Sequence, residues 1–129
     1  MRIALYVHFD GRCEEAIAFY SRIFECKELM KQVYTEKDTD DANLVGKVFH
    51  AEIQIGDFYL YMTDNPTKGS KDAFDLVFEV PTKDEAQTIF HKLSADGEIF
   101  QEIRKMSYGP EIGFLKDKFG INWDVVVSG

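Results

Sequence analysis

The sequence predicts an α+β protein, in which two βαβββ modules form a cupped mixed β-sheet with the helices outside. Each half of the chain contains one amphipathic helical stretch that follows one apolar, strand-like run and precedes three more. The order of elements also repeats. Glu85-Ala86 lies 70 positions after Glu15-Ala16, and Phe119-Gly120 lies 64 positions after Ile55-Gly56. One module alone leaves a sheet face uncovered, so the modules must pair within a chain or swap between chains.

The first half begins with an expected strand over residues 2–9 and a turn at Asp10-Gly11. Its helix, Cys13–Phe24, has apolar residues at three- and four-residue spacing and two glutamates in the first turn, where the helix dipole favours carboxylates. The charged segment 36–46 is either a lid over the cup or a disordered loop, and disorder is favoured. Three further strands are expected over Glu28–Thr35, Lys47–Ile55 and Phe58–Thr63.

The second half repeats this order. A strand over Phe74–Val80 precedes a helix in which Thr82 is the N-cap and Glu85 completes a capping box. Asp96-Gly97 ends that helix. Three more strands are expected over Glu98–Lys105, Glu111–Lys116 and Ile121–Val127.

The length of 129 residues suits a single domain. Within it we expect module 1 at about 1–66, a linker at about 64–72 and module 2 at about 73–129. The linker is predicted because this stretch contains Asn65-Pro66, Gly69 and Ser70, which favour turns over regular structure.

Composition and charge exclude several partners. The net charge is −8 at pH 7 and no basic stripe is present, so neither a nucleic acid nor an anionic membrane is expected to bind. No apolar run is long enough for a membrane span, and the first strand soon reaches His8, so we expect a cytoplasmic protein. Cys13 and Cys26 lie too far apart along the expected helix for a disulfide. Cys13 begins that helix, a position that lowers the pKa of a thiol.

Four segments occur in a fixed order: Phe9–Ala16 with Phe19-Tyr20, then His50-Ala51-Glu52, Ile55-Gly56-Asp57 and Asp117–Trp123. Together they resemble the PhnB-like branch of the vicinal-oxygen-chelate superfamily, the superfamily of glyoxalase I, bleomycin-resistance proteins and extradiol dioxygenases. The resemblance implies the glyoxalase/bleomycin resistance/dihydroxybiphenyl dioxygenase fold. This branch is often labelled 3-demethylubiquinone 3-methyltransferase. The chain lacks the glycine-rich loop of a nucleotide cradle, so methyl transfer is not expected.

Metal-dependent members of that superfamily take four ligands from the first and fourth strands of each module. The resemblance and the two repeat shifts place Leu5, Leu60, Asp75 and Asp124 at these positions. Leucine has no lone pair to donate, so no metal and no cofactor are expected there. Asp75 and Asp124 are either a carboxyl pair in which repulsion raises one pKa or two separate side chains at strand edges, each solvated or paired with a lysine, and the second interpretation is favoured.

The expected ligand pocket contains His8, His50, Tyr59 and Trp123. His8 and His50 are able to meet across neighbouring strands, and Tyr59 and Trp123 occupy equivalent positions from which a flat ring can stack on a ligand. No catalytic residue is assigned, and the weak candidates are His50, Asp75 and Asp124.

The favoured function is metal-independent binding of a small organic ligand by a homodimer. Two alternatives stay open. One is a metal-assisted lyase, isomerase or dioxygenase-like enzyme that uses His50, so whether the chain is an enzyme is undecided. The other is a resistance protein that sequesters a drug in an acidic groove between subunits, as bleomycin-binding members do, which suits the negative net charge.

Overall fold

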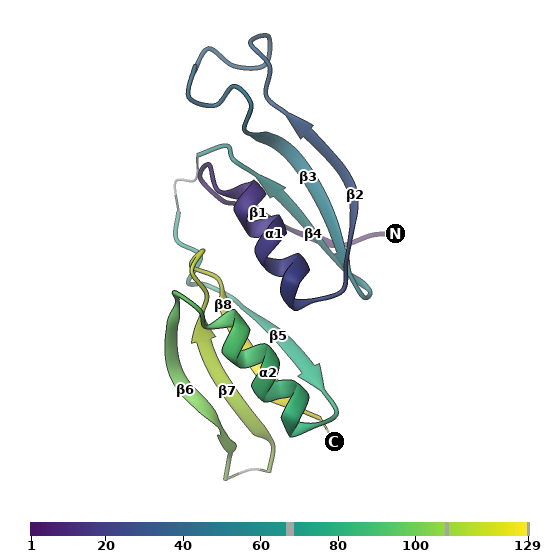
Figure 1. Ribbon diagram of the computed structural model, residues 1–129, viewed down its shortest axis with the longest axis vertical. Helices are drawn as coiled ribbons and strands as arrows, with labels where there is room; N and C mark the ends of the chain where they lie inside the picture. The colour runs from purple at the N-terminus through teal and green to yellow at the C-terminus, as the bar shows by residue number, and fades with distance from the viewer. Residues whose placement is uncertain (67–68, 108, 129) are drawn as a thin grey trace. The chain divides into compact units, whose positions relative to one another are not determined.

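The protein folds into two units of the same build, Met1–Lys68 and Gly69–Gly129 (Figure 1). The computed structural model describes residues 1–66, 69–107 and 109–128. Each unit contains one helix and one four-stranded mixed sheet, so the predicted α+β class and the two βαβββ modules are confirmed.

Unit 1 places its strands in the order β1-β4-β3-β2, with β1 parallel to β4 and the other pairs antiparallel. A tight turn at Gly56-Asp57 joins β3 to β4, and Gly56 has a φ of 58°, which glycine adopts without strain. The elements are β1 (Ala4–His8), α1 (Cys13–Ile23), β2 (Cys26–Val33), β3 (Val48–Ile55) and β4 (Phe58–Thr63).

Unit 2 has the matching order β5-β8-β7-β6, with β5 parallel to β8. The hydroxyl oxygen of Thr82 accepts a hydrogen bond from the Glu85 N–H at 3.2 Å, as the predicted N-cap requires. The elements are β5 (Asp75–Val80), α2 (Lys83–Leu93), β6 (Glu98–Lys105), β7 (Glu111–Lys116) and β8 (Asn122–Val127).

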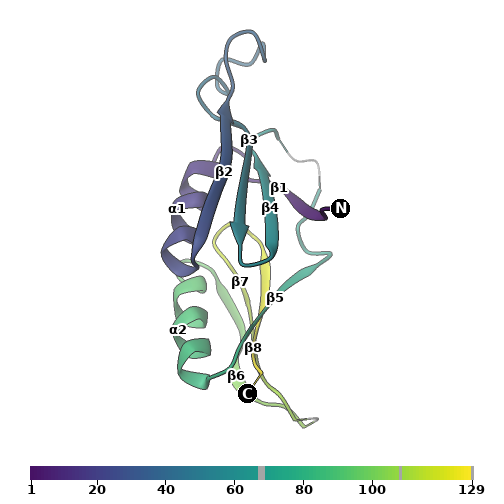
Figure 2. The same ribbon diagram turned by 90° about the vertical axis from the view of Figure 1, so that its right-hand side faces the viewer.

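Each helix covers one face of its own sheet (Figure 2). In unit 1, alternate residues of the central strands are buried under α1, and they include Ala51, Ile53, Leu60 and Met62. We call this side the core face and the other side the open face, in both units. The core face of unit 2 includes Val80, Gly113, Leu115, Trp123 and Val125.

The repeat shifts of 70 and 64 are wrong by one residue in the strands. Leu60 is only 1% exposed and pairs with Leu5, so both leucines belong to the core face. Asp124 pairs with Val77 on the open face of unit 2. A five-residue turn, 117–121, joins β7 to β8 where unit 1 uses two residues, and a one-residue offset moves a side chain to the opposite face.

In each unit, one buried carboxylate accepts hydrogen bonds from backbone N–H groups and so stabilises a turn. Asp64, 1% exposed, accepts hydrogen bonds from the N–H groups of Gly11, Cys13 and Val48, each at 2.9 Å. It thereby caps α1, whose N-cap residue makes no side-chain capping bond. Asp64 is therefore part of the core of unit 1 and not of the linker expected at about 64–72.

Asp117 is the corresponding anchor in unit 2 and is 2% exposed. Its carboxylate accepts from the N–H groups of Phe119 and Ile121 and from the indole Nε1–H of Trp123. The turn between β7 and β8 is therefore fixed from within.

The thiol of Cys13 shows how burial outweighs a helix dipole. Burial, followed by the neighbouring Asp64 carboxylate, raises the pKa of this thiol far above its usual value. The lowered pKa expected for a thiol at a helix N-terminus is therefore wrong. Cys13 and Cys26 are both free, as expected from their separation.

Neither helix in the described parts of the chain is long and apolar enough to cross a membrane.

Candidate functional site

The open face of unit 1 carries a hollow of about 500 Å³ at one end of the sheet. Alternation along β1 brings Tyr6 and His8 to this face, while Val7 between them is buried. The hollow is lined by Tyr6, His8, Tyr34, Asp38, Thr39, Leu44, Phe49, Thr63 and Asn65.

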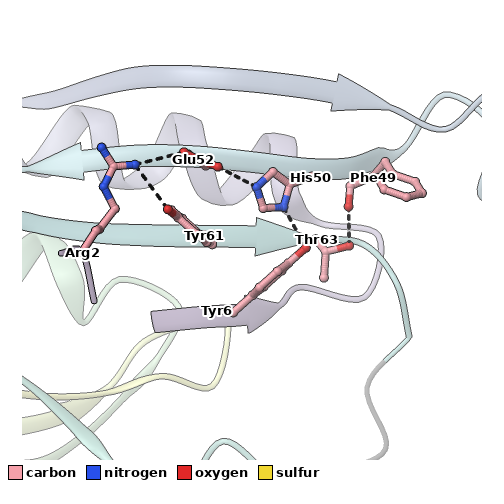
Figure 3. Close-up of polar contacts among 7 residues, drawn as sticks. All are labelled: Arg2, Tyr6, Phe49, His50, Glu52, Tyr61 and Thr63. Carbon is pink, nitrogen blue, oxygen red and sulfur yellow. Dashed lines mark hydrogen bonds and ion pairs between the residues drawn. The ribbon is translucent and has the colours of Figure 1, made fainter. Parts of the chain in front are cut away.

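A β-bulge supplies one aromatic wall. The register of β2 with β3 shifts between Gln32 and Val33, which leaves Phe49 as an extra residue. The Phe49 ring is 39% exposed and meets the ring of Tyr34 edge-on, with centroids 4.8 Å apart. Its carbonyl accepts a hydrogen bond from the Thr63 hydroxyl at 2.7 Å (Figure 3). The bulge thus brings an apolar ring to the rim of the hollow, together with a carbonyl group that already accepts a hydrogen bond.

Tyr6 crosses the open face toward β3, and its hydroxyl lies 2.8 Å from Nδ1 of His50 (Figure 3). The rings of Tyr6 and His50 meet edge-on at 5.3 Å. Burial raises the pKa of Tyr6 above its usual value, against an opposing contribution from Thr63. Tyr6 is therefore a neutral hydroxyl at physiological pH.

His50 is held from its other side by Glu52. The distance from His50 Nε2 to Glu52 Oε2 is 2.8 Å, and both side chains are largely buried. The other Glu52 oxygen lies 3.5 Å from Arg2, whose guanidinium also donates to the Tyr61 hydroxyl at 3.3 Å (Figure 3). We call Glu52, His50 and Tyr6 the Tyr6 clamp, because this chain of contacts fixes where the Tyr6 hydroxyl lies.

His8 also packs against the ring of Tyr6. The two rings are stacked with centroids 6.1 Å apart, and His8 Nδ1 lies 2.8 Å from the carbonyl oxygen of Asn65. His8 and His50 do not touch on neighbouring strands as expected, because β4 lies between β1 and β3. They are brought together only through the ring of Tyr6.

The segment 36–46 forms part of the hollow. Asp38 accepts hydrogen bonds from both the N–H and the hydroxyl of Thr35, at 2.7 and 2.8 Å, and these bonds lower the pKa of Asp38. Asp38, Thr39 and Leu44 line the hollow. The structure therefore gives this segment defined turns, where the sequence favoured disorder.

Unit 2 has a second hollow of about 540 Å³ on its open face, with Asp75 and Asp124 among its lining residues. Burial first, and then a hydrogen bond and charge repulsion from Asp75, raise the pKa of Asp124 to about 6. The two aspartates are thus a carboxyl pair on neighbouring strands, and not the separate solvated residues that the sequence favoured.

Trp123 and Tyr59 lie on opposite faces of their sheets and are not equivalent. Trp123 is 5% exposed and donates its indole N–H to Asp117 at 2.9 Å, so it contributes little surface to the unit 2 hollow. Tyr59 lies on the open face of unit 1, outside the hollow. The Arg2 guanidinium covers its ring at 4.0 Å from the centroid.

The residues present do not fit the metal site of this fold family. The metal-ligand positions of the family lie on the first and fourth strands of each module. When equivalent residues are counted from the strand pairs Ala51–Met62 in unit 1 and Gly113–Val125 in unit 2, the corresponding open-face residues are Tyr6 and Tyr61 in unit 1 and Val77 and Asp124 in unit 2. Valine cannot coordinate a metal, and a protonated tyrosine is a poor ligand. Among residues 1–66, 69–107 and 109–128, no cluster of three or more His, Cys, Asp or Glu side chains is suited to a metal ion.

Sequence reasoning missed Tyr6, Glu52 and Arg2. One available signal was the spacing of His50 and Glu52, since residues two apart in a strand share a face and their side chains then pair. Tyr6 has no such local signal. Its partners lie 44 and 57 residues away in the chain, counted to His50 and Thr63.

A family model described as 3-demethylubiquinone-9 3-methyltransferase matches residues 1–126. The chain belongs to this family. Protein YjdN of Escherichia coli (strain K12) is 28% identical over 140 residues, a match that covers 98% of the chain and 95% of YjdN. The structure of the Bacillus cereus PhnB protein, which carries the same methyltransferase name provisionally, superposes with a TM-score of 0.86 at 26% identity. That match covers 99% of the chain and 100% of the relative.

More distant structures share the fold. One is a glyoxalase/bleomycin resistance protein/dioxygenase family enzyme of Burkholderia phytofirmans PsJN, with a TM-score of 0.63 at 14% identity, covering 97% of the chain and 94% of the relative. The family member described here therefore has the glyoxalase-like fold, as its sequence implied.

Proposed function

We propose that this protein binds a small organic ligand without a metal ion, in the hollow on the open face of unit 1. The observation that carries the proposal is the Tyr6 clamp, in which Glu52 and His50 hold the Tyr6 hydroxyl at the edge of an aromatic-lined hollow. A polar group held in a defined orientation beside apolar rings is how pockets fix the position of a ligand. The unsuitable donor set at the family's metal positions supports binding without a metal.

Native mass spectrometry of purified protein tests this proposal. We expect a co-purified organic molecule, or one captured from a metabolite mixture, that is lost in a Tyr6→Phe variant. Elemental analysis of the same sample should find no stoichiometric zinc, nickel or iron. Stoichiometric metal that disappears in His50→Ala would instead support the metal-assisted enzyme.

The structure gives little support to that enzyme alternative. A metal-bound histidine needs one ring nitrogen free for the ion. Nδ1 of His50 contacts Tyr6 and Nε2 contacts Glu52, both at 2.8 Å. Methyl transfer also gains no support, since the turn from β1 to α1 contains the single glycine Gly11 and the first sheet is mixed.

A second candidate, sequestration of a cationic aromatic drug, is favoured by the unit 2 hollow. It combines the Asp75–Asp124 pair with the rings of Phe100 and Phe114. A drug of this class that raises the melting temperature by several degrees in the wild type, but not in Asp124→Asn, would favour this candidate through linkage.

A cytoplasmic homodimer is part of the same proposal. The two free cysteines are compatible with a reducing compartment. Light scattering should give about twice the chain mass of 14.9 kDa, and a monomeric mass would contradict the dimer.

A further inference from the structure

The positions of the hydrogen atoms in the Tyr6 clamp follow from its geometry. A carboxylate only accepts hydrogen bonds, so the Nε2 atom of His50, 2.8 Å from Glu52, must carry the proton. In the neutral imidazole, Nδ1 then has a lone pair and no hydrogen. The contact between Nδ1 and the Tyr6 hydroxyl is therefore a bond in which Tyr6 donates. The hydroxyl of Tyr6 has a single proton, and this proton is donated to His50.

The Thr63 hydroxyl also contacts the Tyr6 side chain, but its hydrogen is directed to another acceptor. Its hydroxyl hydrogen is donated to the carbonyl of Phe49 at 2.7 Å, and its oxygen accepts from the Asn65 N–H at 3.1 Å. The Tyr6 oxygen, in a side chain that belongs to a residue 49% exposed, is therefore left with lone pairs only.

Two further side chains of the hollow, His8 and Asp38, also offer hydrogen-bond acceptors to a ligand. The Asn65 carbonyl only accepts, so Nδ1 of His8 carries the proton and Nε2 of the neutral ring keeps a lone pair. Asp38 is an anion in which hydrogen bonds from Thr35 favour the charged form. Among the residues that the structure describes, no lysine or arginine lines the hollow.

We propose that this hollow selects planar ligands that carry a hydrogen-bond donor, such as a phenolic hydroxyl or an aromatic amine, and discriminates against ligands that only accept. The inference rests on the proposed function and names the ligand class of the same site. The rings of Tyr34 and Phe49 provide the apolar walls, and the Tyr6 oxygen accepts the ligand's proton.

Phenol and anisole form a matched pair of probes, because anisole replaces the donating hydroxyl of phenol with a methyl ether. Both are titrated into ¹⁵N-labelled full-length protein, and dissociation constants are taken from the shifts of hollow residues. We expect phenol to bind about five-fold more tightly than anisole, the usual contribution of one neutral hydrogen bond.

Two variants link this preference to the clamp. Tyr6→Phe removes the acceptor, so the ratio of the two constants should fall to about one. His50→Ala leaves the Tyr6 hydroxyl but releases its proton, so anisole should gain affinity and the ratio should again fall. Tyr61→Phe is the matched control, since its hydroxyl accepts from Arg2 and lies outside the hollow. It should keep the wild-type ratio.

Equal affinities of the wild type for the two probes would overturn the inference, as would binding of anisole alone or of neither probe. A wild-type ratio that survives in both Tyr6→Phe and His50→Ala would overturn it as well. None of these results affects the proposed function, which is tested separately by the co-purified molecule and the metal content.

Discussion

Asp64 and Asp117 show, at the scale of single residues, how a buried charge is stabilised by N–H donors. Each carboxylate receives three N–H hydrogen bonds and neither has a cation among these partners. Hydrogen bonds to the charged form offset the cost of removing it from water. The donors around Asp64 come from residues 11, 13 and 48, so no local pattern reveals its role.

Asp64→Ala should reduce the free energy of unfolding by roughly 3 kcal/mol or more, because three N–H groups, two of them buried, lose their acceptor at about 1–3 kcal/mol each. Urea unfolding followed by circular dichroism measures this loss. Asp57→Ala, in the exposed turn between β3 and β4, is the control and should change stability by no more than about 0.5 kcal/mol. Similar losses for the two variants would contradict the anchoring role of Asp64.

Asp124 makes stability depend on pH. Its pKa rises from 3.8 in the unfolded chain to about 6 in the folded protein, mainly through burial and then through Asp75. Between these values the folded state binds more protons. The stabilising contribution is therefore complete below about pH 4 and is lost as the pH rises through about 6.

Relative to Asp124→Asn, the wild type should lose roughly 1 kcal/mol of stability between pH 4 and pH 7, a value reduced for the partial exposure of the side chain. Urea unfolding of both proteins at the two pH values provides the comparison. A constant difference between wild type and variant across this range would show that Asp124 does not titrate in it.

At the scale of elements, the packing of α2 on its sheet depends on a residue without a side chain. A Cβ atom added at Gly113 would lie 2.6 Å from the ring of Phe90 and 2.7 Å from Ile103. Helix and strand approach closely only because β7 has a glycine at this point. The strand signal predicted β7 correctly, but the need for glycine arises from the helix above it.

Gly113→Ala should lower the free energy of unfolding by about 1–3 kcal/mol through overpacking. Gly69→Ala is the matched control, because a Cβ at Gly69 meets nothing within 4 Å and its φ lies outside the left-handed region. Thermal unfolding of the two variants measures the difference. An unchanged melting temperature for Gly113→Ala would mean that α2 can shift without cost.

At the scale of the whole molecule, the repeat conceals a difference between the units. Both have the same strand order and a helix over one face, yet their open faces carry different chemistry. Unit 1 presents the Tyr6 clamp, in which a tyrosine hydroxyl faces the hollow, and unit 2 presents the Asp75–Asp124 pair.

If the fold needs no metal, a chelator should leave it unchanged. We expect the melting temperature in excess EDTA to equal that in buffer, because removal of an ion bound only to the folded state would lower it by linkage. A fall of several degrees that is reversed by zinc or nickel would contradict metal-independence.

Local apolar patterning was enough to predict the elements and their repeated order. Period-2 and period-3.6 apolar patterns are local, and the two halves carry them independently, so β4, β6 and β7 have the bounds that were predicted. The tertiary structure decided which face each strand residue occupies and which distant side chains meet. A turn of five residues instead of two moved Asp124 away from the position of Leu60, and the Tyr6 clamp required β1 and β3 to be placed on either side of β4. The clamp depends on contacts across more than forty residues, and local periodicity carries no information about them.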